Sequence, residues 1–384
     1  MRFDRLVLLL FAGLSASACT TLGYYGQAAS GGYEILARSQ PIAALLDDGT
    51  NIGPDFRPPP AELPPEVKAR LARVEQIRDF ASWDLGLPDN DSYRMYADLG
   101  RPVVAWNVVA TPEFSLTPKE WCFPIAGCVS YRGYFSQARA QRFADGLKRE
   151  GLDVRIAAVS AYSTLGWFPD PVLRSQLRRS DADLAGVIFH ELGHQELYVP
   201  GDTAFNESFA TTVEVEGLRR WFARHHDPAA LEEYLLDKSR QGQFVQLVLS
   251  YRTRLEALYA QPLDAAAMRA AKVRIFMELH QAYAGLRRQW GGYSGYDAWF
   301  GRDLNNADLA SIGVYHQYVS GFEELLRREH GDFRAFYRAA KMLSRLSANE
   351  RAARLAELGN LRVASGKSGQ KERPPVHARP HREE

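Results

Sequence analysis

The stretch Asp181-Ala-Asp-Leu-Ala-Gly-Val-Ile-Phe-His-Glu-Leu-Gly-His-Gln195 joins an apolar run to the pattern His190-Glu-x-x-His194. The apolar run predicts a helix with one face in the core, and Asp181 or Asp183 can cap its start. Positions four apart on a helix share a face, so both imidazoles can converge on one Zn²⁺ ion. The alternative is a helix with two partly buried histidines, which would place polar groups on a core-facing element at a cost in free energy.

Glu191 lies between the two histidines in sequence, about a third of a turn around the helix from His190. In that position its carboxylate can face the metal without ligating it. Zinc lowers the pKa of a bound water from ~16 to ~7, and a nearby carboxylate takes the proton as hydroxide attacks a carbonyl. Glu191 is therefore the predicted general base.

A third protein ligand is expected on the next helix. Pro200-Gly201 ends the first helix, and Asp202 or Thr203 can cap a second one that carries Glu207. A helix–turn–helix of this length can fold Glu207 back against both histidines. Glu207 is therefore the predicted third ligand.

Two further carboxylates on the second helix compete with Glu207 for that role, namely Glu214 and Glu216. Glu214 lies seven residues beyond Glu207 and Thr211 lies four beyond it, so all three share one helix face. Thr211 and Glu214 suit a supporting role, such as accepting the free N–H of a ligating histidine.

The two helices together resemble the gluzincin metallopeptidases, in which an Asn-Glu pair, here Asn206-Glu207, supplies the third ligand. More closely, residues 20–355 are similar to a bacterial family of predicted zinc aminopeptidases. Besides the metal helices, the similarity rests on Trp121-Cys-Phe-Pro124, Tyr131-Arg-Gly-Tyr-Phe135, Ala161-Tyr-Ser-Thr-Leu-Gly-Trp-Phe-Pro-Asp-Pro171, and Leu304-Asn-Asn-Ala-Asp-Leu309 with Tyr315. The resemblance implies one Zn²⁺ ion and a peptide substrate.

The chain departs from the better-known gluzincins in two ways. The twelve residues between His194 and Glu207 form a shorter spacer than in thermolysin or the large aminopeptidases. The Gly-x-Met-Glu-Asn segment with which large aminopeptidases hold a free amine is absent from the sequence. Exopeptidase and endopeptidase action therefore both remain open.

The resemblance also implies that a Tyr or His from a distant helix stabilises the oxyanion. Tyr315 is the first candidate and His316 the second; alternatively, Tyr315 and Tyr318 are ordinary aromatics of a helical core. Two other functions compete with the peptidase. One is a non-catalytic envelope lipoprotein with a structural metal site, although such a site usually has four protein ligands and no base. The other is a metal-dependent amidase that acts on a non-peptide envelope substrate.

The N-terminus is typical of an exported protein. Residues 1–18 combine Arg2 and Arg5, an apolar run over 6–14 and the small residues 15–18, a signal-peptide pattern too short to span a bilayer. The following Cys19 resembles the lipobox of bacterial lipoproteins, with Ala16 where Leu is commoner. That resemblance implies a lipid-anchored protein of the cell envelope, on the periplasmic face of the outer membrane because Thr20 is not Asp. A signal peptide cleaved without lipidation is the alternative.

Composition excludes one class of partner and suggests one covalent link. The chain has 47 basic and 46 acidic residues, so it lacks the strongly basic face that a nucleic-acid-binding protein needs. If Cys19 carries lipid, Cys122 and Cys128 remain as a pair in a compartment that permits disulfides, and Pro124 and Gly127 can turn the chain between them. We predict a disulfide, with two free thiols as the alternative.

The pattern along the chain predicts a predominantly helical α+β protein. After the signal peptide (1–18) we expect a Gly- and Pro-rich tether (19–65), a zincin-like catalytic domain (66–358) and a disordered polar tail (359–384). Apolar spacing predicts a helix over 66–85. Short β-branched runs at 103–110, 127–135 and 154–161 predict a small sheet of three or four strands, with a helix over 136–150. From Ser180 onward the pattern is helical, interrupted at 291–295.

Overall fold

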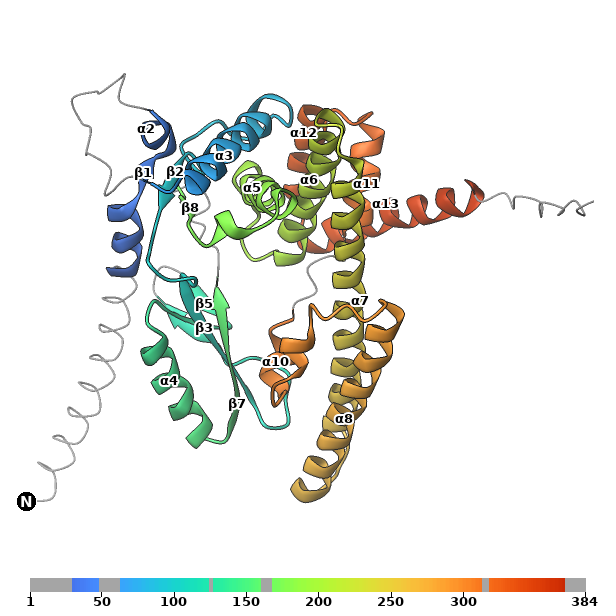
Figure 1. Ribbon diagram of the computed structural model, residues 1–384. Coiled ribbons are helices and arrows are strands. Elements are labelled where there is room, and N and C mark those ends of the chain that lie inside the picture. Colours follow the sequence, from blue (N-terminus) through green and yellow to red (C-terminus); the bar gives the residue numbers. More distant parts are fainter. Residues whose placement is uncertain (1–29, 48–62, 124–126, 160–167, 313–317, 370–384) are drawn as a thin grey trace, which may run out of the picture. The chain divides into compact units, whose positions relative to one another are not determined.

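The computed structural model describes residues 30–47, 63–123, 127–159, 168–312 and 318–369 (Figure 1). It is the expected α+β chain, with mostly helical structure and a helical C-terminal half. The chain forms two compact units. Unit 1 comprises Met1–Phe80, Asp89–Ile188 and Leu218–Gly313, and unit 2 comprises Ala81–Pro88, Phe189–Gly217 and Val314–Glu384.

The division was not predicted because two of its boundaries fall inside helices α5 (Asp181–Glu196) and α6 (Thr203–Arg224). A helix interior has no Pro- or Gly-rich linker that would mark a change of unit. Among the described residues, no helix combines the length and apolar character that crossing a membrane requires.

The described part of unit 1 starts with secondary structure inside the segment predicted as a tether. Residues 30–38 are helical, and β1 (Gln40–Pro41) and α2 (Ile42–Leu46) follow, with Ile35 and Ile42 fully buried. β1 pairs antiparallel with β2 (Met95–Ala97), and β2 pairs parallel with β8 (Val172–Leu173). These strands have two or three residues each, too few to show an alternating pattern, so the sequence did not reveal this sheet.

The predicted sheet is present as a second, antiparallel sheet of unit 1, in the order β6-β3-β7. It consists of β3 (Ala105–Pro112), β6 (Arg132–Tyr134) and β7 (Leu152–Val159), and the predicted helix is α4 (Gln137–Arg149). The helix buries small and apolar residues, among them Ala144 and Leu147, in one core with Val108 and Val154 of the sheet. Residues 108–111 of β3 are all buried, so both faces of this strand are covered over that stretch.

A short hairpin carries the cysteine pair. In β4 (Trp121–Phe123) and β5 (Gly127–Val129), Cys122 lies directly opposite Cys128. A disulfide joins the two residues, whose Cα atoms are 3.8 Å apart. The structure therefore contains the pairing that the sequence predicted.

Two long helices of unit 1, α7 (Pro228–Tyr259) and α8 (Ala265–Gln289), lie side by side (Figure 1). Each begins with an aspartate whose side chain accepts a backbone N–H three residues on, Asp227 and Asp264 respectively. Their shared core continues into α9 (Asp297–Phe300), where the ring of Phe300 stacks on Tyr283 at 3.9 Å. Gly291 and Gly292, both with positive φ, follow the end of α8 at the predicted interruption.

The block Leu304–Leu309, which carries part of the family resemblance, has a structural role. Asn305 and Asp308 form a capping box at the start of α10 (Asn306–Ala310). The fully buried Asn306 donates from its amide to the carbonyls of Glu113 and Ser115, and it accepts from the Tyr259 hydroxyl at 2.7 Å. These bonds hold α10 against the end of β3.

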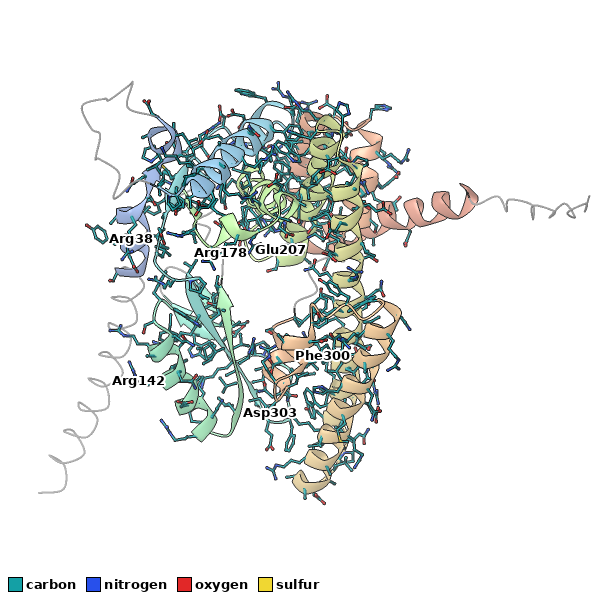
Figure 2. The ribbon with its side chains drawn as sticks, viewed as in Figure 1. Arg38, Arg142, Arg178, Glu207, Phe300 and Asp303 are labelled. Atoms are coloured by element: carbon teal, nitrogen blue, oxygen red, sulfur yellow. A yellow bond between two sulfur atoms is a disulfide. The ribbon has the colours of Figure 1, made fainter. Side chains whose placement is uncertain are left out.

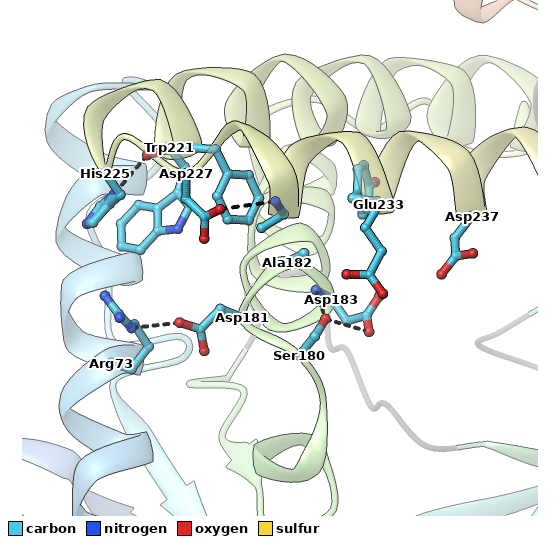
Figure 3. Close-up of a pocket in the computed structure, with 13 residues that line it drawn as sticks. Arg73, Ser180, Asp181, Ala182, Asp183, Trp221, His225, Asp227, Glu233 and Asp237 are labelled. Carbon is cyan, nitrogen blue, oxygen red and sulfur yellow. Dashed lines mark hydrogen bonds and ion pairs between the residues drawn. The ribbon is translucent and has the colours of Figure 1, made fainter.

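Helix α5 begins at a side-chain cap on a different residue from the one that the sequence predicted. We expected Asp181 or Asp183 as the cap, but Ser180 occupies that position: its Oγ accepts the Asp183 N–H at 3.0 Å and donates to Asp183 Oδ2 at 2.8 Å (Figure 3). Asp181 instead forms ion pairs with Arg70 and Arg73 of α3 (Pro65–Trp83). Ser180 caps the helix, while Asp181 is engaged by two arginines and Asp183 by the Ser180 hydroxyl.

In unit 2, α11 (Val319–Arg328), α12 (Phe333–Ser344) and α13 (Ala348–Gly369) accompany the first part of α6. Phe209 of α6 stacks on Phe336 with ring centroids 5.4 Å apart, and Phe205 meets Phe322 edge-on at 5.1 Å. The tail was expected to be disordered from residue 359, but α13 extends to Gly369. Polar composition concealed this continuation, and residues 370–384 lie outside the described part.

A pH-dependent contribution to stability comes from Asp308. Its side chain is buried, and burial raises its pKa to about 6 although the Asn305 N–H and Arg302 oppose the rise. Because the folded pKa exceeds the unfolded value, this contribution is fully present below about pH 4 and is lost as pH rises through 6. The carboxyl therefore stabilises the fold more in acid than at neutral pH.

The variant Asp308→Asn tests this linkage. Lowering the pH from about 7 to about 4.5 should increase the unfolding free energy of the native chain by about 2 kcal/mol relative to the variant. Urea denaturation of both proteins at the two pH values measures the difference. An unfolding free-energy difference that does not change with pH would contradict the assignment.

Candidate metal centre

Three predicted ligands lie together in unit 2. His190 and His194 come from α5 and Glu207 comes from α6, and one ligand atom from each lies within 4.8 Å of the others. Glu207 Oε2 is 3.3 Å from His190 Nε2, and Glu207 Oε1 is 3.6 Å from His194 Nε2. Among the described residues, this is the group of His, Cys, Asp and Glu side chains with spacing suited to a metal ion.

The close approach of the two helices depends on small residues. A Cβ atom added at Gly193, inside the His-Glu-x-x-His pattern, would lie 3.3 Å from the Cα of Ala210 on α6. Larger side chains at these positions would push the helix axes apart. Glu207, one turn before Ala210 on α6, would then move away from both histidines. Gly193 and Ala210 therefore set the spacing at which the three ligands meet.

The turn between α5 and α6 is fastened by Asn206. Its side-chain amide donates to the Val199 carbonyl at 2.8 Å, and its Oδ1 accepts the Val199 N–H at 2.8 Å. Asn206 is buried, so the loss of these bonds would leave polar groups unsatisfied away from water. The paired bonds fix the backbone of the residue adjacent to Glu207.

Two ion pairs brace the same turn against the C-terminal helices. Asp202 accepts the Phe205 N–H at the start of α6 and binds Arg351 of α13, with Nη2 to Oδ2 at 2.8 Å. Lys341 of α12 binds Glu196 at the end of α5 at 2.6 Å. The metal helices are therefore held at the turn by residues about 150 positions along the chain.

Glu214 lies on the far side of His190 from Glu207. Its Oε2 is 3.1 Å from His190 Nδ1, whereas Glu207 approaches Nε2 of the same ring. This is the geometry of a carboxylate that orients a ligating histidine and increases its basicity. Thr211, the other expected supporting residue, is buried on the same helix.

The carboxylates control the protonation of His190. Burial disfavours its imidazolium, but hydrogen bonds to Glu207 and Glu214, together with the charge of Glu191, outweigh burial and raise the pKa of His190 to about 9. A proton on His190 thus sits between two carboxylates at neutral pH. A metal ion that replaced this proton would find the same anionic surroundings.

His194 has the opposite protonation. Burial, and then the positive charge of His190, lower its pKa to about 4 although Glu207 opposes the shift. The neutral ring places Nε2 at 3.6 Å from Glu207 Oε1, too long for a hydrogen bond. His194 Nδ1 is buried and has no hydrogen-bond partner among the described residues. Two imidazole nitrogens and one carboxylate within 4.8 Å of one another form a donor set that fits a metal ion.

Glu191, the predicted base, lies on α5 between the two histidines and is partly buried. Its charge helps to raise the pKa of His190, which places the carboxylate near the cluster. Tyr315 and His316 lie outside the described residues, as does Cys19. Tyr318, the first described residue after them, donates its backbone N–H to Ser208 Oγ at 3.2 Å, one position after Glu207.

Sequence reasoning did not assign roles to Asn206, Gly193 or Arg351. The adjacent pair Asn206-Glu207 and the glycine within the metal motif were visible in the sequence. Their functions depend on a turn geometry and a helix distance that spacing alone does not specify. Arg351 had no local signal, because its partner is far away in the chain.

Comparison with known proteins places the chain in a family. No curated protein and no solved structure matches it. A family model matches residues 23–355, a span that contains all three clustered ligands together with Glu191, Glu214 and Tyr315. The chain therefore belongs to the peptidase family described as "Putative aminopeptidase".

Proposed function

We propose that this protein is a zinc-dependent peptidase in which His190, His194 and Glu207 hold one Zn²⁺ ion and Glu191 is the general base. The observation that carries the proposal is the cluster itself: two imidazole nitrogens and one carboxylate within 4.8 Å of one another. Three protein ligands of this kind are typical of a catalytic zinc site, whereas a structural site usually has four. Family membership supports a peptide substrate.

In the proposed mechanism Glu191 and Glu214 have separate roles beside the metal ion. A bound zinc ion supplies Lewis acidity, which lowers the pKa of water and polarises the scissile carbonyl. Glu191 accepts the proton of the attacking water and later delivers it to the leaving amine. Glu214 keeps the His190 ring oriented through Nδ1, so that Nε2 stays directed at the cluster.

Tyr315 is the proposed oxyanion-stabilising residue, with His316 as the alternative. The hydrogen bond from the Tyr318 N–H to Ser208 Oγ supports this proposal. This contact joins the chain three residues after Tyr315 to the residue that follows Glu207. A phenol donates a hydrogen bond to a developing oxyanion while it stays neutral.

We also propose that Cys19 carries a lipid that anchors the protein at the cell envelope, on the periplasmic face of the outer membrane. The support is the sequence pattern of residues 1–19. The disulfide between Cys122 and Cys128 fits this location, because disulfides persist in oxidising compartments.

Glu191→Gln and Glu207→Gln should separate the base from the ligand. Glu191→Gln should retain about one equivalent of zinc, while activity falls by ~10²-fold or more because no carboxylate takes the proton. Glu207→Gln should bind zinc more weakly because an amide replaces an anionic donor, and excess zinc should restore part of its activity. Metal analysis and cleavage of a peptide library measure both effects.

The matched control is Glu232→Gln, which changes an exposed glutamate of α7 that makes no ion pair with the described residues. Its zinc content and activity should stay near native values. Zinc retention by Glu207→Gln together with zinc loss by Glu214→Gln would refute the ligand assignment. Full activity of Glu191→Gln would refute the proposed mechanism.

Tyr315→Phe should lower kcat by roughly 10²-fold and leave KM and zinc content almost unchanged, because the hydroxyl is required only for the charge that develops in the transition state. Tyr318→Phe is the control on the same segment. Steady-state kinetics on one peptide substrate distinguish the two. An unchanged kcat for Tyr315→Phe, with a loss for His316→Gln, would transfer the role to His316.

Lipidation of Cys19 can be tested by metabolic labelling with palmitate. The native chain should incorporate label, and its processing should stop in the presence of the lipoprotein signal-peptidase inhibitor globomycin. Cys19→Ser should lose the label. Equal labelling of the two proteins would exclude a lipid on Cys19.

A further inference from the structure

A hollow in unit 1 is lined largely by arginine, and part of its wall is the segment directly before α5. Its volume is about 480 Å³, and its walls come from residues 98–102 and from the segment around η1 (Gln176–Arg178). The lining contains four arginines and one acid: Asp98, Gly100, Arg101, Pro102, Arg174, Ser175, Arg178 and Arg179.

Carboxylates neutralise only part of this charge. Asp98 pairs with Arg174 at 2.7 Å, and Glu34 from the first helical segment binds both terminal nitrogens of Arg101 at 3.0 Å. Arg178 is exposed and forms no ion pair or side-chain hydrogen bond with any described residue. Asp98 and Glu34 are thus engaged by Arg174 and Arg101, whereas the Arg178 guanidinium keeps its charge unpaired among the described residues.

The backbone of the segment that carries Arg178 is held in place by a side chain of α3. Arg70 of α3 donates from Nε to the Leu177 carbonyl at 3.0 Å and from Nη2 to the Arg179 carbonyl at 2.8 Å. The backbone on both sides of Arg178 is therefore fixed before any ligand arrives. A fixed backbone lowers the entropy cost of binding, which is a property of preformed sites.

An anion is the ligand class that this arrangement suits. The guanidinium group presents its donors as a planar fork that matches the oxygens of carboxylate and phosphate. A carboxylate carries one charge and is satisfied by one fork. A phosphate monoester carries about −1.5 to −2 at neutral pH and offers three oxygens, so it can bridge guanidinium groups from both walls.

We propose that this arginine hollow binds a phosphate group. Two sources have the required chemistry: a free phosphate compound and the phosphate head group of a lipid. Glu34 connects the hollow to the N-terminal helical segment through Arg101, and Arg38 of that segment lies within 3.3 Å of Glu34 (Figure 2). The proposal is independent of the peptidase assignment.

The test uses the purified full-length chain and the variant Arg178→Gln. The matched control is Arg142→Gln, which removes an exposed arginine of α4 that makes no ion pair with the described residues (Figure 2). One arm titrates inorganic phosphate by calorimetry. The other measures binding to phosphatidylcholine vesicles with and without phosphatidic acid, so that any lipid on the chain contributes equally to both vesicle types.

Arg178→Gln should weaken phosphate binding by about tenfold or more, because charge-assisted hydrogen bonds are lost, while Arg142→Gln binds like the native chain. Arg178-dependent binding of inorganic phosphate supports a free phosphate compound. Arg178-dependent preference for phosphatidic acid without binding of inorganic phosphate supports a lipid head group. Absence of binding in both arms, or equal effects of the two substitutions, overturns the proposal.

Discussion

The geometry of the candidate centre depends on how closely α5 and α6 pack. Helix axes in proteins are usually separated by 8–10 Å, with the smaller values where side chains are small. Gly193 opposite the Cα of Ala210 permits such an approach within one turn of Glu207. The metal motif therefore contains its own spacing device, because the residue that allows the contact lies directly before His194. Without that contact, Glu207 on α6 would lie too far from the two histidines of α5 to share a metal ion with them.

The packing of α5 against α6 brings carboxylates close to the histidine rings in a largely buried place, which is unfavourable unless a cation is present. Glu207 and Glu214 approach the two nitrogens of His190, and the resulting pKa of about 9 means that the site takes up a proton at neutral pH. His194 stays neutral, although it faces the same carboxylate. Unequal protonation of two histidines one turn apart arises from the positions of the carboxylates, since both rings are largely buried. A divalent ion would neutralise the carboxylates and satisfy both lone pairs at once.

Patterns within short stretches of sequence predicted the elements whose residues are close together in the chain. The helix–turn–helix from Asp181 onward, the antiparallel sheet and α4 follow from apolar periodicity and from turn residues, and the structure has them. The sheet formed by β1, β2 and β8 escaped prediction because its strands contain two or three residues that pair across 54 to 76 positions of sequence. The cap at Ser180 was missed for a related reason: the neighbouring Asp181 is engaged by Arg70 and Arg73 of α3, which the local sequence does not reveal.

The sequence segments that carry the family resemblance have two different roles, which their long-range contacts distinguish. His190 to Glu207 carries donor atoms for the proposed chemistry, whereas the Asn305-Asn306 pair binds carbonyls at the end of β3 and caps α10. Both blocks look equally polar in the sequence, and only the partners distinguish them. A buried asparagine whose side-chain oxygen and nitrogen both bind neighbouring groups is required for the fold. Asn206 also supports the metal centre, because both of its bonds go to Val199 in the turn that precedes the ligand Glu207. A residue that supports the site is thus recognised by which backbone it holds, and this information exists only in the folded chain.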